Sequence, residues 1–286
     1  MGLARPLVGL LMALSRPYRF HGALLTLGVQ TVEPDAAAAR EMAQAAGLPL
    51  DRLPATGPID DRACLGAIGF SPVTRLDLFP EEGPDVVADF TEPLPAGMEG
   101  GFDAVLDSGT TEHIYNLPRA VENLHRVLRP GGLVIHASPF CGWENHGFIQ
   151  QSPKLWGRLW GLSGYRELQG WLVHIPQPGS PPSRRPWVAH IEDLDRPIAC
   201  DSARFRTLLV VLARRTPEAS LKAPVDTHTR QFMVPPESLR PVDPETERAL
   251  RTQGLLPPAG QQGGAEKPGR GTVISGLRAY FGGQRG

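Results

Sequence analysis

Cysteine is scarce in this sequence of 286 residues, and the three cysteines, Cys64, Cys141 and Cys200, lie far apart. They form no C-x-x-C pair, so the sequence indicates neither a zinc ribbon nor a small scaffold held by disulfides. Isolated cysteines of this kind fit a reducing compartment best. We therefore expect a cytoplasmic protein.

An excess of charge of one sign is also lacking. Lys and Arg number 29 and Asp and Glu number 30, which gives a formal net charge of −1. A general nucleic-acid binder carries a strongly basic surface that attracts phosphates. The composition therefore predicts no nucleic-acid partner.

The N-terminal region lacks an apolar run long enough to cross a bilayer, which takes about 20 residues. The apolar stretch Pro6–Leu14 is much shorter. Leucines at helical spacing, beginning with Leu3, predict a short helix that packs on the domain. Weak contact of this helix with a membrane surface is the alternative, and no transmembrane segment is expected.

Glycine and proline are abundant instead, at 32 and 30 residues. Pro-Pro pairs and a Gly-rich stretch mark the C-terminal part, where no long periodic element follows Thr216, which indicates flexible chain. A short helix at 273–281 is the exception. The predicted organisation has three parts: a helical extension (1–20), one domain (21–216) and a Pro/Gly-rich, largely disordered tail (217–286).

Strand-like and helix-like segments alternate through the predicted domain. Strands are predicted at 23–27, 73–77, 85–89, 102–107, 133–137 and 206–214, and helices at 34–46, 60–68 and 117–128. The last of these helices has apolar residues at i, i+3, i+4 and i+7, which is one buried stripe. Such alternation predicts an α/β fold, with a doubly wound, mostly parallel sheet covered on both faces.

An aspartate ends each of three successive predicted strands: Asp77, Asp89 and Asp107. In a doubly wound sheet, ligands lie beyond the carboxyl ends of the strands. A carboxylate there can accept both hydroxyls of a ribose, because it has two acceptor oxygens in one plane. Each aspartate alone would equally suit a turn, but the three together favour a nucleoside site.

The segment FDAVLDSGTTEHIYNLPRAVENLHRVLRPGGLVIHASPF, residues 102–140, resembles the core of the class I S-adenosylmethionine-dependent methyltransferases of the type 11 group. ADFTEPLP (88–95) is similar to the family's segment after strand three. ENHGFIQQSPKLW (144–156) is similar to a subgroup linked to sugar or glycan pathways. The resemblance spans about residues 20–215 and implies a seven-stranded Rossmann-like sheet, S-adenosylmethionine as cofactor, and methyl transfer to a small-molecule acceptor, with a sugar derivative as one candidate.

The resemblance also implies roles for individual residues. Asp77 matches the ribose-binding acid, and Asp89 matches the adenine-side acid, with Phe90 beside the ring. Asp107, Ser108 and Gly109 match the loop along the methionine end of the cofactor. Gly28 and Gln30 belong to the first cofactor loop.

That first loop departs from the family's acidic residue followed by G-x-G-x-G. Only Gly28 matches; Thr26 stands for the acid, Gln30 for the second glycine and Val32 for the third. Glycines let the backbone approach the cofactor closely, so we expect the side chains of Gln30 and Val32 to crowd it. Gln30 and Thr31 could donate hydrogen bonds in compensation. A catalytically silent module for binding or assembly is therefore the alternative function.

Methyl transfer requires alignment of the acceptor with the methyl carbon, and a base only if the acceptor is a hydroxyl or a protonated amine. His113 and His146 are the candidate catalytic residues. A structural role for His113 at the start of the following helix region is equally open. His136 is expected in the core, and Glu112 is expected to pair with Arg119 or Arg126.

Overall fold

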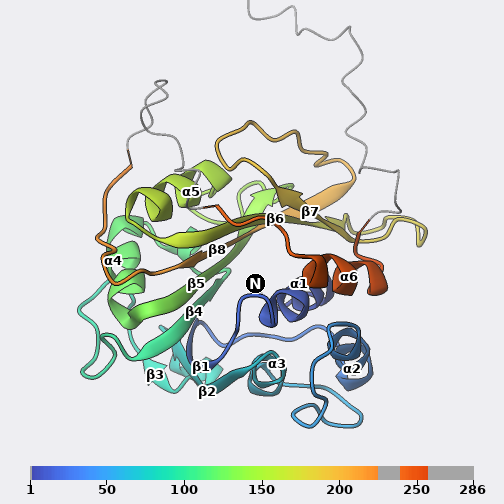
Figure 1. Ribbon diagram of the computed structural model, residues 1–286, viewed down its shortest axis with the longest axis horizontal. Coiled ribbons are helices and arrows are strands. Elements are labelled where there is room, and N and C mark those ends of the chain that lie inside the picture. Colours follow the sequence, from blue (N-terminus) through green and yellow to red (C-terminus); the bar gives the residue numbers. More distant parts are fainter. Residues whose placement is uncertain (1, 225–238, 257–286) are drawn as a thin grey trace, which may run out of the picture. The chain divides into compact units, whose positions relative to one another are not determined.

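The computed structural model describes residues 2–224 and 239–256. Its eight strands form one sheet in the order β3-β2-β1-β4-β5-β8-β6-β7 (Figure 1). The strands are β1 (Gly22–Leu27), β2 (Phe70–Asp77), β3 (Val86–Val87), β4 (Phe102–Ser108), β5 (Leu128–Cys141), β6 (Arg166–Pro176), β7 (Trp187–Ile191) and β8 (Phe205–Arg214).

The first five strands are parallel to one another. β8 is antiparallel to both β5 and β6, so β6 runs in the same direction as β5. β7 pairs antiparallel with β6 and forms the edge. The predicted doubly wound, mostly parallel α/β sheet is confirmed, with one strand more than the seven expected because β7 extends it.

Helices cover both faces of the sheet (Figure 1). The helices are α1 (Arg5–Ser15), α2 (Ala36–Ala45), α3 (Asp61–Ala67), α4 (Leu117–Val127), α5 (Pro153–Leu162) and α6 (Pro244–Thr252). Buried side chains of α1, α2, α3 and α6 belong to one apolar cluster, and those of α4 and α5 belong to a second.

The two apolar clusters lie on opposite faces because side chains alternate along a strand. On β1, Leu24 belongs to the first cluster and Leu25 to the second. On β4, Ala104 and Leu106 belong to the first and Val105 to the second. Both faces of the central strands are therefore apolar, which explains their continuous hydrophobic runs.

Helix α1 is buried from Pro6 to Ser15. It packs against α6 and α2 and approaches β6 and β7. Since its apolar side chains are already covered, the alternative of a membrane-surface helix is wrong for this structure. Among residues 2–224 and 239–256, no helix is both long and apolar enough to cross a membrane.

Helix α6 lies within the segment that the sequence predicts as a largely disordered tail. Asp243 caps it by accepting hydrogen bonds from the backbone N–H groups of Glu245 and Thr246. Ala249 and Leu250 are buried in the first apolar cluster. The prediction therefore fails at 239–256, because a short helix with one apolar face escapes composition-based analysis. Residues 225–238 and 257–286, including the predicted helix at 273–281, lie outside the described residues.

Candidate cofactor and acceptor site

The carboxyl ends of β1, β2 and β4 lie side by side at one edge of the sheet. Leu27, the last residue of β1, is in register with Leu76 of β2 and with Asp107 of β4. Gly28 therefore begins the loop that runs between Asp77 and Asp107. Asp77 pairs with Val87 of β3, and Asp89 follows two residues later. The topology thus brings the three predicted aspartates to one edge.

The Asp77 side chain is partly exposed and held in one orientation by two backbone N–H groups. The N–H of Phe79 donates to Oδ1 over 3.0 Å, and the N–H of Val29 donates to Oδ2 over 3.3 Å. Each carboxylate oxygen can accept a further bond. The carboxylate is therefore both oriented and open to a ligand.

Gly28 is required by the geometry of this turn. Its φ of +87° is a left-handed conformation that side-chain-bearing residues rarely adopt. A Cβ atom there would lie 3.3 Å from Nε2 of Gln30 and 3.6 Å from Oδ2 of Asp77. A side chain at Gly28 would therefore be strained and would crowd Gln30 and Asp77.

The substituted side chains of the first loop turn into the protein. Nε2 of Gln30 donates to the carbonyls of Leu27 and Gly28, at 3.1 and 3.3 Å, and the residue is only 5% exposed. Val32 forms a parallel bridge with Leu3 and packs against the first apolar cluster. Gln30 therefore braces the loop, and its amide N–H groups do not point outward as compensating donors.

The replacement of the family's acid by Thr26 has a similar consequence. The buried Thr26 hydroxyl donates to the carbonyl of Gly28 over 2.9 Å. From the β4 side, the Thr110 hydroxyl donates to the carbonyl of Leu27 over 2.8 Å. Hydrogen bonds within the chain thus hold the degenerate loop in place from both sides.

Asp107 differs from the role that the sequence predicts for it. Its carboxylate is fully buried and accepts from the N–H groups of Thr110 and Thr111, the Thr111 hydroxyl and Nδ1 of His136. These donors surround both oxygens. Asp107 therefore positions the loop after β4, and both of its carboxylate oxygens already accept from donors of the chain.

The network around Asp107 extends into the second apolar cluster. Nε2 of His136 accepts from the indole N–H of Trp160 over 3.1 Å, and its ring stacks on Trp156 with a centroid distance of 3.7 Å. Because Nε2 accepts, Nδ1 is the nitrogen that carries the proton toward Asp107. His136 lies in the core, as predicted. The adjacent loop residues Ser108 and Gly109 are also buried.

The adenine side of the edge also departs in part from the prediction. Asp89 is exposed, and its Oδ1 accepts from both the N–H and the hydroxyl of Thr91 at 2.8 Å. Phe90 is buried in the second cluster, so its ring packs inside the domain and not beside a ligand. Three exposed apolar residues at the strand ends were not predicted: Leu78, Phe79 and Val87. Of these, Leu78 has a sequence signal, since it directly follows the strand-ending Asp77.

The acceptor side consists of three residues that the loops after β4 and β5 bring together. Glu112 and His113 lie in a short 3-10 turn, η2 (Thr111–His113), and His146 lies in the loop after β5. The imidazole rings of His113 and His146 have centroids 5.0 Å apart. Both histidines are exposed, whereas Glu112 is 2% exposed.

The pKa values of these groups are shifted by their surroundings. Burial raises the pKa of Glu112 to about 8, and the negative charge of Asp107 contributes. Partial burial lowers the pKa of His113, to which His146 adds repulsion, and it also lowers the pKa of His146. Both imidazoles are therefore neutral near pH 7 and offer a nitrogen lone pair.

The ion pairs expected for Glu112 are wrong. Arg119 pairs with Glu122 over 2.7 Å, and Arg126 pairs with Glu99. Nor does His113 cap a helix, since its side chain is 46% exposed and α4 begins at Leu117. Two exposed aromatic residues, Tyr115 and Phe148, each follow one of the histidines by two positions.

Comparison with known protein families finds one match, which covers the central part of the sheet. A family model described as a methyltransferase domain matches residues 71–136, which run from β2 into β5. The match covers less than half of the chain. It agrees with the family that residues 102–140 resemble. No curated protein matches the sequence.

Several solved structures resemble the domain. The N-methyltransferase NodS from Bradyrhizobium japonicum, in complex with S-adenosylhomocysteine, is 13% identical with a TM-score of 0.39, over 74% of this chain and 85% of NodS. A SAM-dependent methyltransferase from Archaeoglobus fulgidus is 12% identical with a TM-score of 0.41, over 74% of this chain and 94% of the other.

For two other structures the chain spans only about half of their length. The matches cover 55% of a Methanococcus maripaludis protein and 47% of the CMeT domain of the citrinin polyketide synthase. They cover 46% and 68% of this chain, at 12% and 14% identity and TM-scores of 0.29 and 0.36.

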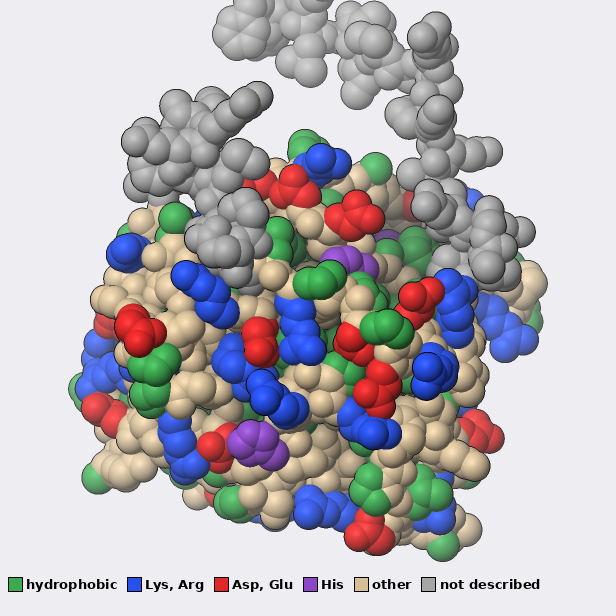
Figure 2. All heavy atoms as spheres, viewed as in Figure 1, with side chains coloured by type: hydrophobic (Ala, Val, Ile, Leu, Met, Phe, Trp, Pro, Cys, Tyr) green, Lys and Arg blue, Asp and Glu red, His purple; other side chains and the backbone are tan. Residues whose placement is uncertain are grey.

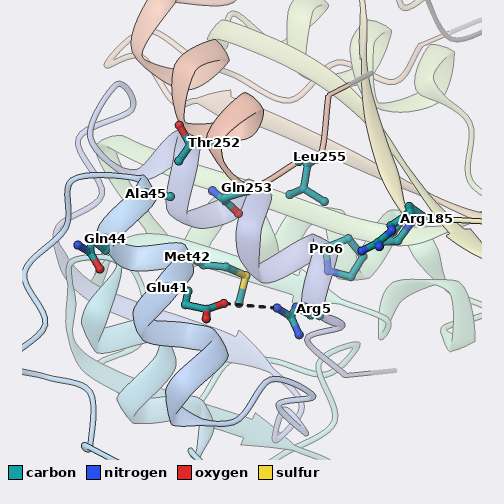
Figure 3. Close-up of a pocket in the computed structure, with 12 residues that line it drawn as sticks. Arg5, Pro6, Glu41, Met42, Gln44, Ala45, Arg185, Thr252, Gln253 and Leu255 are labelled. Atoms are coloured by element: carbon teal, nitrogen blue, oxygen red, sulfur yellow. Dashed lines mark ion pairs between the residues drawn. The ribbon is translucent and has the colours of Figure 1, made fainter. Parts of the chain in front are cut away.

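A large cavity lies away from this edge. It has a volume of about 1070 Å³, and α1, α2, α6 and the segment before β7 line it (Figure 3). An ion pair between Arg5 and Glu41, at 3.8 Å, crosses from α1 to α2 there. None of the predicted site residues lines this cavity.

The charged side chains on the surface are mixed in sign. Figure 2 shows basic and acidic groups interspersed over the visible face. This distribution agrees with the formal net charge of −1. The visible face therefore carries no broad basic patch of the kind that follows a phosphate backbone.

Proposed function

We propose that this chain transfers a methyl group from S-adenosylmethionine to a small acceptor at the edge formed by β1, β2 and β4. The observation that carries the proposal is the open carboxylate of Asp77 beside the bare backbone of Gly28, within a methyltransferase domain. When bound, S-adenosylmethionine supplies an electrophilic methyl group on its sulfonium. The chain has to bind this group, exclude water and align an acceptor.

The residues on the cofactor side fit an adenosine group. Asp77 would accept hydrogen bonds from the ribose hydroxyls, since its two oxygens are held in place by Val29 and Phe79. Leu78 and Val87 are exposed although they are apolar, and an adenine packed on them would remove that surface from water. We retain Asp89 as the candidate acceptor of the adenine amine.

The residues on the acceptor side suit a hydroxyl or amine. His113 and His146 are the groups that we propose to act on the acceptor, next to the loop after β4. The exposed rings of Tyr115 and Phe148 offer flat apolar surfaces on which a sugar or aromatic ring would stack. These features support a small-molecule acceptor and keep a sugar derivative as a candidate.

The alternative function, a catalytically silent binding module, is favoured by one observation. The Gln30 side chain occupies the loop where the family has a glycine, and its Oε1 has no hydrogen-bond partner among the described residues. A loop filled in this way would restrict the methionine end of the cofactor. The two functions differ in whether the Asp77 edge binds S-adenosylmethionine.

Isothermal titration of the full chain with S-adenosylmethionine separates the two functions. The enzyme predicts saturable heat, and Asp77→Ala should weaken binding at least tenfold, because hydrogen bonds to a charged group contribute about 1.5–3 kcal/mol. The control is Asp51→Ala, which changes an exposed aspartate in the loop between α2 and α3. Absence of heat at millimolar ligand would refute the proposal.

A further inference from the structure

The acceptor side contains three potential metal-ligand atoms close to one another. One carboxylate oxygen of Glu112, one nitrogen of His113 and one nitrogen of His146 all lie within 4.8 Å of one another. Oε1 of Glu112 and Nε2 of His113 are 4.0 Å apart. Three donor atoms from two separate loops thus lie close enough together to share one ion.

The carboxylate of Glu112 is the unusual member of this set. It is 98% buried, and neither of its oxygens has a hydrogen-bond partner in the described part of the chain. Burial of a carboxylate without a partner is costly, so such groups are normally paired or coordinate a metal. The imidazoles of His113 and His146 lie beside it. An ion bound between the three groups would give the Glu112 carboxylate the partner that it lacks.

The two loops that carry the donors are fixed to each other. The N–H of Ile149 donates to the carbonyl of Glu112 over 3.1 Å. A Cβ atom on Gly147 would lie 2.7 Å from that same carbonyl oxygen, so the loop after β5 passes too close for any side chain there. The position of His146 relative to Glu112 is therefore determined by the backbone.

The outer side of the loop after β5 is also supported. The ring of Trp143 packs edge-on against His146 with centroids 5.3 Å apart, and the guanidinium of Arg206 lies 4.5 Å from the centre of the Trp143 ring. β8 thus braces the loop that presents His146. The Trp143 ring therefore limits how far the His146 imidazole can turn.

We infer that Glu112, His113 and His146 bind a divalent first-row transition-metal ion of the Zn²⁺ or Co²⁺ type. Two imidazoles and one carboxylate suit such ions, whereas Mg²⁺ and Ca²⁺ prefer oxygen ligands alone. Donors around a tetrahedral Zn²⁺ lie about 3.3 Å apart, so the cluster contracts on binding. The exposed side chains of His113 and His146 permit this contraction.

The role of the ion rests on the proposed function. Three protein ligands leave at least one coordination position open, and the two exposed imidazoles place that position toward solvent. There the ion would hold an acceptor through a hydroxyl oxygen and lower the pKa of that hydroxyl. The inference therefore assigns a hydroxyl-bearing acceptor to the site and makes the two imidazoles ligands.

Titration of the full chain with Zn²⁺, and of a second sample with Co²⁺, tests the site without any cofactor. We expect one ion per chain and a Co²⁺ spectrum without the thiolate charge-transfer band that cysteine ligands would give. Glu112→Gln, His113→Ala and His146→Ala should each weaken binding at least tenfold. His21→Ala, which removes an exposed histidine directly before β1, should leave it unchanged.

Two results would overturn the inference: wild-type binding no tighter than in His146→Ala, or a thiolate band in the Co²⁺ spectrum. Thermal melts of each variant show whether lost binding reflects lost folding. His146→Ala should disturb folding least, because His146 lies in an exposed loop. Asp77→Ala separates this inference from the proposed function. It should weaken the binding of S-adenosylmethionine at least tenfold and retain the ion, so each claim can fail alone.

Discussion

At the scale of single residues, Asp77 and Asp107 show how one strand-end pattern produces two different roles. Both follow apolar strands, and both reach the same edge of the sheet. Asp77 is held by two backbone N–H groups and remains partly exposed, whereas Asp107 is enclosed by donors from the loop and from β5. The sequence could predict the edge but not which carboxylate was enclosed, since His136 and Thr111 reach Asp107 only through folding.

Replacement of Asp107 tests its structural role. Asp107→Asn places an amide against the donors of Thr111 and His136, and it leaves buried polar groups unpaired. We expect the free energy of unfolding to fall by about 1–3 kcal/mol, the cost of leaving a buried polar group without its hydrogen-bond partner. Urea denaturation measures it, with Asp51→Asn as the exposed control. Equal midpoints for the two variants would contradict the buried network.

Because His174 is buried, we expect the free energy of unfolding to depend on pH. It lies on β6, bonds to the hydroxyl of Thr207 over 3.0 Å and stacks on Trp187. Burial lowers the pKa of His174 to about 4, although Asp201 opposes this. Its unfolded value is about 6.5, so the stabilisation is complete above that pH and declines as pH falls toward 4, by up to about 1.4 kcal/mol per pH unit.

The measurement for this prediction is a series of urea unfolding curves between pH 7 and 4. In His174→Gln the free energy of unfolding should fall less steeply with pH, by about 1.4 kcal/mol per pH unit at most, because glutamine takes up no proton. His21→Ala, at an exposed position, should decline like the wild type. Parallel curves for wild type and His174→Gln would show that His174 takes up its proton equally in both states.

At the scale of elements, the sequence predicts the parts whose apolar pattern is regular. The stripe of α4 and the continuous run of β8 were found at nearly their observed bounds. The segment 141–200 was left unassigned, yet it forms α5, β6 and β7. In β6 the apolar run is interrupted by Gln169 and His174, which are buried and whose polar atoms bond across the fold, so no simple period remains.

Helix α6 provides a test at this scale. Leu250 is fully buried against the cluster that contains α1, so Leu250→Ala should lower the free energy of unfolding by about 2–5 kcal/mol. Arg248→Ala, on the exposed face of the same helix, should change it by less than about 0.5 kcal/mol. If both variants unfold like the wild type, the segment contributes nothing to the folded domain.

At the scale of the whole molecule, the strand order of the sheet places all parts of the candidate site at one edge. Parallel strands β1, β2 and β4 end at one edge, and loops from that edge carry Asp77, Gly28 and the Glu112–His113–His146 cluster. The fold and the family were predictable from strand alternation and from residues 102–140. The burial of Phe90 and the part of Glu112 were not, since each depends on neighbours distant in sequence. The inward turn of Gln30 was not either, since it depends on the conformation of its own loop.

The crystal structure of the chain with S-adenosylhomocysteine tests the central claim most directly. The account predicts that the ribose hydroxyls lie within hydrogen-bond distance of the Asp77 carboxylate, that the adenine packs on Leu78 and Val87, and that the sulfur faces the loop of His113. Density for the ligand in the cavity between α1, α2 and α6, with nothing beside Asp77, would contradict it.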